Sequence, residues 1–171
     1  MGGEGAAKIL SRAREGGATT SADILAPGDP GLLEWVAPAF PELDYLLPND
    51  EQVLAFTGAS DLEEGCRALV DRGVGHVAAT RGADGVLIVG PDGAESVPAF
   101  EIDVVDTTGC GDAFSAGFLR GLSLGRDRSD AATLGCATAA LVAQGLGTDY
   151  GEYDLAAVER FASEAARRPA A

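Results

Sequence analysis

Basic residues are scarce in this chain. Its 171 residues include 12 lysines and arginines against 27 aspartates and glutamates, a formal net charge of −15 at pH 7, and Lys8 is the only lysine. Nucleic acids and anionic membrane surfaces bind basic faces, so this composition argues against both as partners. A polyphosphate ligand would need local backbone dipoles and a divalent metal to hold it.

Cysteines and long apolar runs are also few. Cys66, Cys110 and Cys136 are an odd number without close spacing, which argues against a disulfide framework. No apolar run approaches the length of a membrane span, and the first residues lack the pattern of a secretory signal. We therefore expect a cytoplasmic location. The hydrophobic content of 46% is typical of a globular fold, and we expect one domain over residues 1–171.

Alternating helical and strand patterns predict an α/β fold with a partly parallel sheet. Helices are expected over residues 4–14, 32–40, 51–56, 62–72, 111–123, 129–144 and 154–167. Strands are expected over residues 21–26, 43–47, 76–80, 85–89 and 95–97. We expect residues 167–171 to fray. Sites in such sheets lie beyond the carboxyl ends of strands, where Asn49, Thr80 and the 106–112 turn all fall.

The segment from Asp106 to Phe118 is the most informative. A polar turn with two glycines runs directly into an apolar helix, and Asp112 stands at the junction. Helix N-termini bind anions through unpaired N–H groups, and Gly109 and Gly111 let the backbone approach such an anion closely. A carboxylate beside an anion repels it, which makes sense if Asp112 removes a proton during a reaction. The pattern indicates phosphoryl transfer.

Two familiar phosphate-binding motifs do not fit this turn, and a third reading stays open. A Walker A loop needs a lysine, and none lies nearby. A dinucleotide fingerprint needs a third glycine where Phe114 stands. The structural alternative is an ordinary helix cap, with Thr107 or Thr108 capping and Asp112 favouring the helix dipole.

Asp106 to Phe118 closely resembles the second signature of the ribokinase (PfkB) family of carbohydrate and nucleoside kinases. Residues 21–148 follow the family's C-terminal half in order. The resemblance implies a ribokinase-like three-layer α/β/α fold with a mostly parallel sheet, and ATP-dependent phosphorylation of a sugar or related alcohol. It also implies that Asp112 is the catalytic base and that the backbone of Gly109, Cys110 and Gly111 forms the anion hole.

Cys110 replaces the family's usual alanine. A thiol at a helix N-terminus can be a nucleophile, and His76, the only histidine, is its candidate base. A lone histidine on a predicted strand is more often a packed residue. Because a backbone N–H would bind the anion, we expect cysteine to be tolerated at this position.

Two further segments resemble the family's motifs. In 48–52, Asn49 matches an asparagine that helps to arrange Mg²⁺ and phosphates through water, while Gln52 stands where the family has glutamate. In 80–85, Thr80, Gly82 and Gly85 match a turn near the nucleotide, within which Arg81 either reaches a phosphate or is solvated. The structural alternatives are a helix start at Asn49 and a glycine-rich strand connection at 80–85.

The resemblance implies additional contacts near the chain's end. Cys136 falls where many members place a residue near the adenine, and Gly147 matches a later loop glycine. Asp106 and Thr108 match residues near a monovalent cation such as K⁺, although a turn aspartate is the structural alternative for Asp106.

The family's N-terminal half, with its lid and most sugar-binding residues, has no counterpart here. One reading is therefore a C-terminal portion of an ATP-dependent kinase acting on a small sugar-like substrate. The other is a non-catalytic remnant that binds nucleotide or a partner chain. Loss of the N-terminal strands would expose a sheet edge, which favours homo-oligomers. The residues that would determine the specificity for a particular sugar are absent.

Overall fold

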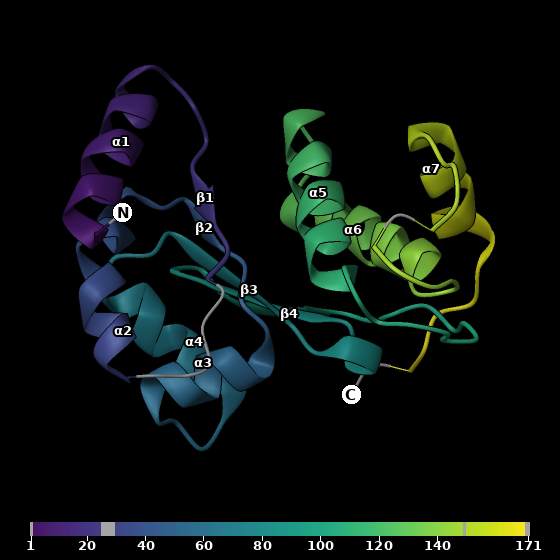
Figure 1. Ribbon diagram of the computed structural model, residues 1–171, viewed down its shortest axis with the longest axis horizontal. Coiled ribbons are helices and arrows are strands. Elements are labelled where there is room, and N and C mark those ends of the chain that lie inside the picture. The colour runs from purple at the N-terminus through teal and green to yellow at the C-terminus, as the bar shows by residue number, and fades with distance from the viewer. Residues whose placement is uncertain (1, 25–29, 149, 170–171) are drawn as a thin grey trace. The chain divides into compact units, whose positions relative to one another are not determined.

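A computed structural model describes residues 2–24, 30–148 and 150–169 (Figure 1). The chain forms two compact units, which we describe separately. The first unit is Met1–Thr80 with Leu87–Glu95, and the second is Arg81–Val86 with Ser96–Ala171. No helix in the described ranges is both long and apolar enough to cross a membrane.

Five strands form one sheet in the order β1-β2-β3-β4-β5. They are β1 (Ser21–Ala22), β2 (Tyr45–Leu46), β3 (His76–Thr80), β4 (Val86–Gly90) and β5 (Gly93–Val97). The pairs β1–β2 and β2–β3 are parallel. The connections from β3 to β4 and from β4 to β5 are too short for parallel crossovers, so the sheet is mixed.

The helices begin where polar capping residues stand. The helices are α1 (Gly3–Glu15), α2 (Pro30–Val36), η1 (Ala37–Glu42), α3 (Asp50–Thr57), α4 (Leu62–Asp71), η2 (Gly82–Asp84), α5 (Cys110–Ser123), α6 (Arg128–Val142) and α7 (Leu155–Glu164). Four side chains cap the helix that follows them by accepting a hydrogen bond from a backbone N–H of its first turn. They are Asn49, Asp61, Asp127 and Asp154. Such a cap is worth about 1 kcal/mol. Gly58 ends α3 in the left-handed conformation, as predicted.

Several predicted elements differ from the structure, among them the helix expected over 154–167, which ends at Glu164. The strand expected over 21–26 is only Ser21–Ala22 among the described residues, and Leu25 and Ala26 lie outside them. The helix expected over 32–40 ends as an α-helix at Val36 and continues as the 3₁₀ helix η1, because Pro41 lacks an N–H for an α-helical bond. The strand expected over 43–47 is shortened to Tyr45–Leu46.

The first unit has an apolar core beneath β2, β3 and β4, made by side chains that are almost fully buried. Its members include Phe40, Leu46, Val53, Cys66, Leu69, Val77 and Val89. In Figure 1, α3 and α4 lie beside each other and against β3. Burial of the Cys66 thiol in this core raises its pKa to about 12, so this cysteine is inert.

In the second unit, α5 and α6 pack closely because glycines face each other (Figure 1). A Cβ at Gly117 would lie 2.9 Å from Gly135 Cα and 2.9 Å from the Leu134 carbonyl oxygen. Such overpacking forces the helices apart.

We expect Gly117→Ala to lower the free energy of unfolding by about 3 kcal/mol. The matched control is Gly111→Ala on the same helix, where an added Cβ meets no atom within 4 Å. Urea denaturation measures both. Equal stability of the two variants would contradict the packing of α5 on α6.

Candidate functional site

The turn before α5 is fixed to the end of α6 in the second unit. The Val105 N–H donates to the Ala143 carbonyl at 2.8 Å. Helix α5 then begins after Gly109, whose φ of 83° is left-handed, and neither threonine of the turn caps it. The capping role considered for Thr107 or Thr108 is therefore wrong for the side chains. The Thr107 carbonyl instead accepts the Cys110 N–H at 3.1 Å.

Asp106 joins two loops. Its Oδ1 accepts both the Thr108 N–H at 2.9 Å and the Thr108 hydroxyl at 2.8 Å. Its Oδ2 accepts the Gly147 N–H at 3.0 Å. These bonds, from Gly147 first and then Thr108, lower the pKa of the Asp106 carboxyl. The structure thus brings Asp106, Thr108 and Gly147 together, and the carboxylate anchors the loops.

The lowered pKa of Asp106 predicts a pH-dependent contribution to stability. The ionised carboxylate is favoured in the folded chain, so its contribution is present at neutral pH and is lost as the pH falls below about 4. We expect Asp106→Asn to be less stable than the parent at pH 7, with the difference shrinking as the pH falls below about 4. Urea unfolding at several pH values tests this, and a difference independent of pH would contradict it.

The two glycines of the turn have different surroundings. A Cβ at Gly109 would lie 3.0 Å from three atoms of Thr148, and the left-handed φ also demands glycine. At Gly111 no atom lies within 4 Å of an added Cβ, so packing does not require glycine there. Asp112 is exposed in the first turn of α5 beside this open space. The helix N-terminus is therefore accessible to an anion.

The Cys110 side chain points away from that space. Its Sγ lies 3.7 Å from the Ala139 carbonyl of α6, and burial, with the charge of Asp106, raises the thiol pKa. A raised pKa is unfavourable for a nucleophile. In the first unit, His76 stacks on Tyr45, with ring centres 5.4 Å apart. Both observations favour packing roles over thiol catalysis.

The first unit brings Asn49 next to Thr80. The two residues form a parallel bridge, and the Thr80 N–H donates to the Pro48 carbonyl at 3.0 Å. In the second unit, the Arg81 N–H donates to the Gly85 carbonyl at 2.7 Å and closes the following turn. Gly82 is exposed with a φ of 53° and open space around it. Gly85 is buried, where an added Cβ would lie 2.7 Å from Ala99 N.

The amide side chains of Asn49 and Gln52 form a capping box. Asn49 Oδ1 accepts the Gln52 N–H, and Gln52 Oε1 accepts the Asn49 N–H, each at 2.8 Å. Gln52 Nε2 also donates to the Ile24 carbonyl at 2.8 Å. No group of three or more potential acidic, histidine or cysteine ligands occurs in the described part of the chain. These residues therefore do not fit direct binding of Mg²⁺, which prefers carboxylate and phosphate oxygens.

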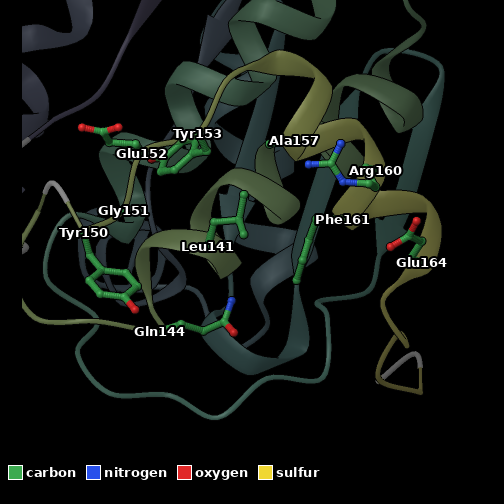
Figure 2. Close-up of a pocket in the computed structure, with 10 residues that line it drawn as sticks. All are labelled: Leu141, Gln144, Tyr150, Gly151, Glu152, Tyr153, Ala157, Arg160, Phe161 and Glu164. Atoms are coloured by element: carbon green, nitrogen blue, oxygen red, sulfur yellow. The ribbon is translucent and has the colours of Figure 1, made fainter.

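Two features were missed by the sequence reasoning. The expectation that residues 167–171 fray is wrong for Arg167 and Arg168, because the segment 166–168 pairs with residues 99–101. A pocket of about 410 Å³ also opens beside α7, and Figure 2 shows the residues that line it on α6, on α7 and on the segment between them. The predicted site residues are not among those that line it. Neither feature has a sequence signal, because both depend on tertiary packing.

Comparison with known proteins identifies the family. The profile of the pfkB family carbohydrate kinases matches residues 3–154, so the chain belongs to that family. A 1-phosphofructokinase from Haloferax volcanii is 39% identical over 114 residues, covering 63% of this chain and 37% of that enzyme. A cytidine kinase from Thermococcus kodakarensis is 40% identical over 97 residues, covering 54% of this chain and 34% of that enzyme.

The fold resembles solved kinases. The fructokinase from Vibrio cholerae O395, in a form with fructose, ADP and calcium ion, aligns with a TM-score of 0.80 and 27% identity, covering 90% of this chain and 54% of that one. This likeness confirms the predicted ribokinase-like α/β class. The chain spans about a third of the two curated relatives' lengths.

Proposed function

We propose that this chain is the nucleotide-binding and catalytic half of an ATP-dependent kinase that phosphorylates a hydroxyl of a sugar or related alcohol. Asp112 takes the proton from the substrate hydroxyl, whose oxygen then attacks the γ-phosphorus of ATP. The backbone of Gly109, Cys110 and Gly111 stabilises the negative charge on the transferring group. The observation that carries the proposal is the open α5 N-terminus with an exposed carboxylate beside it.

Further residues are assigned to the nucleotide. Thr80, Gly82 and Gly85 are proposed to approach it through the backbone, with Asn49, Cys136 and Gly147 as further contacts. Open space at Gly82 and the pairing of Asn49 with Thr80 support these assignments. Cys136 is buried, which supports a packing contact rather than a polar one.

The hydrogen bonds that Asn49 and Gln52 already form limit how these residues can contact a cation. The capping box leaves Asn49 and Gln52 able to reach Mg²⁺ only through water, using the second lone pair of each amide oxygen. The metal would be held mainly by the phosphates, where it neutralises charge. Asp106 and Thr108 are assigned to a monovalent cation such as K⁺, with the ionised Asp106 as the charged group.

The second candidate is a non-catalytic remnant that binds nucleotide or a partner chain. It is favoured by the amide at Gln52, where the family has a glutamate. Melting temperature with and without ATP·Mg²⁺, followed by phosphate transfer to sugars and nucleosides, separates the candidates. Stabilisation with transfer supports the kinase, and stabilisation without transfer supports the remnant. No stabilisation by ATP would contradict the kinase and a nucleotide-binding remnant, and would favour a remnant that binds a partner chain.

A further inference from the structure

Gln52 lies among the ends of three neighbouring strands. Ile24 follows β1, Asn49 follows β2, and Thr80 is the last residue of β3. These strands are parallel and adjacent, so their carboxyl ends meet at one edge of the sheet. All of these residues belong to the first unit.

The Gln52 side chain uses both ends of its amide. Its Oε1 accepts the Asn49 N–H at 2.8 Å, and its Nε2 donates to the Ile24 carbonyl at 2.8 Å. The Gln52 backbone N–H also donates to Asn49 Oδ1 at 2.8 Å. Gln52 thus holds Asn49 by two hydrogen bonds and ties it to the chain that follows β1.

The two residues that Gln52 holds are themselves anchored. Asn49 forms a parallel bridge with Thr80, whose N–H donates to the neighbouring Pro48 carbonyl at 3.0 Å. The Ile24 side chain packs against the apolar core of the unit. Hydrogen bonds therefore run from Ile24 through Gln52 and Asn49 to the end of β3.

This arrangement requires an amide at position 52. A carboxylate there would still accept the Asn49 N–H, and its negative charge would be favourable at a helix N-terminus. An ionised carboxylate has no N–H or O–H, however, so it would place an acceptor against the Ile24 carbonyl oxygen. The contact with Ile24 gives a physical reason for glutamine where the family has glutamate.

We propose that Gln52 is a positioning residue, whose amide fixes Asn49 by tying it to the chain after β1. This role, rather than contact with a cation, accounts for the amide. The effect on ATP binding rests on the proposed function, because Asn49 is assigned there to the nucleotide. The effect on the fold is independent of that assignment.

Thermal melting without nucleotide tests the effect on the fold. Gln52→Glu should lower the melting temperature by about 3–8 °C at pH 7, because the Ile24 carbonyl loses its donor and faces a carboxylate. Helix-capping rules alone predict no loss or a gain. Ala55→Glu, which adds the same charge at an exposed position of α3, should stay within about 2 °C of the parent. A Gln52→Glu melting temperature at or above the parent's, or a loss equal to that of Ala55→Glu, would overturn the inference.

Backbone amide NMR of Gln52→Met, which keeps the side-chain length without its hydrogen bonds, separates this role from an ordinary helix cap. We expect the amide resonances of Asn49 and Thr80 to shift. The Glu64 amide, capped by Asp61 at the start of α4, should stay unchanged. A shift at Asn49 without one at Thr80 would show only a local cap and would contradict the positioning role.

ATP·Mg²⁺ titration of the folded chains tests the effect on the nucleotide. Gln52→Glu should weaken the affinity about threefold or more, because Asn49 is no longer fixed. Stronger binding would show that position 52 acts through the cation, and unchanged binding by a destabilised variant would show a structural residue only; either result overturns the positioning role. If the parent itself binds no ATP, the proposed function fails, while the melting and NMR results still decide whether Gln52 fixes Asn49.

Discussion

Asp112→Asn is expected to lower phosphate transfer by about 10²–10⁴-fold while leaving ATP affinity nearly unchanged, in this chain or in a longer parent. Asparagine has a similar shape but cannot take the proton of the attacking hydroxyl. Removing the negative charge also removes its repulsion of the phosphates, so nucleotide binding should not weaken. The loss therefore falls on the chemical step rather than on binding.

Transfer of labelled γ-phosphate and the ATP-induced shift in melting temperature measure the two quantities separately. Asp103→Asn is the matched control, because Asp103 is an exposed carboxylate of the same unit that lies before the turn. It should keep the parent's turnover. Comparable turnover by Asp112→Asn would exclude Asp112 as the base, and an equal loss in Asp103→Asn would indicate a general charge effect.

Gly111→Ala is expected to lower turnover by about 10²-fold without lowering stability. The open space at Gly111 accommodates a Cβ in the folded chain, and alanine favours a helix by about 1 kcal/mol over glycine. The same Cβ would stand where the anion approaches the backbone. Displacing a group from such donors costs about as much as losing one of them.

Gly109→Ala gives the contrasting result. Its left-handed φ and the 3.0 Å approach to Thr148 predict a loss of about 1–3 kcal/mol in unfolding free energy. Urea denaturation and labelled-phosphate transfer measured on both variants test the distinction. Full turnover by a stable Gly111→Ala variant would show that the backbone at this position does not approach an anion.

The local fold was predictable where signals are short-range. The strand His76–Thr80 and the starts of α4 and α6 follow from apolar patterns and aspartate caps. The change to a 3₁₀ helix after Val36 was not predicted, because local periodicity does not separate α from 3₁₀ geometry around prolines. The sequence thus predicted the presence of helices and strands better than their type or their boundaries.

At the candidate site, too, local features were predictable from the sequence and long-range contacts were not. Asp112 and Gly111 were found from a contiguous motif, and the structure adds that Gly111 is open while Gly109 is packed. The bonds of Asp106 to Gly147 and of Arg167 to Thr133 each join residues far apart in sequence. Such contacts depend on how helices and loops pack, so a single sequence contains no local pattern for them.

Backbone amide NMR of the chain, titrated with ADP, Mg²⁺ and tetrafluoroaluminate, tests the central claim most directly. This combination mimics a transferring phosphoryl group. We predict that the largest amide shifts fall at Gly109, Cys110 and Gly111, because those N–H groups bind the mimic. Unchanged resonances at these three amides, while the nucleotide binds elsewhere in the chain, would contradict the assignment of the α5 N-terminus as the phosphoryl-transfer site.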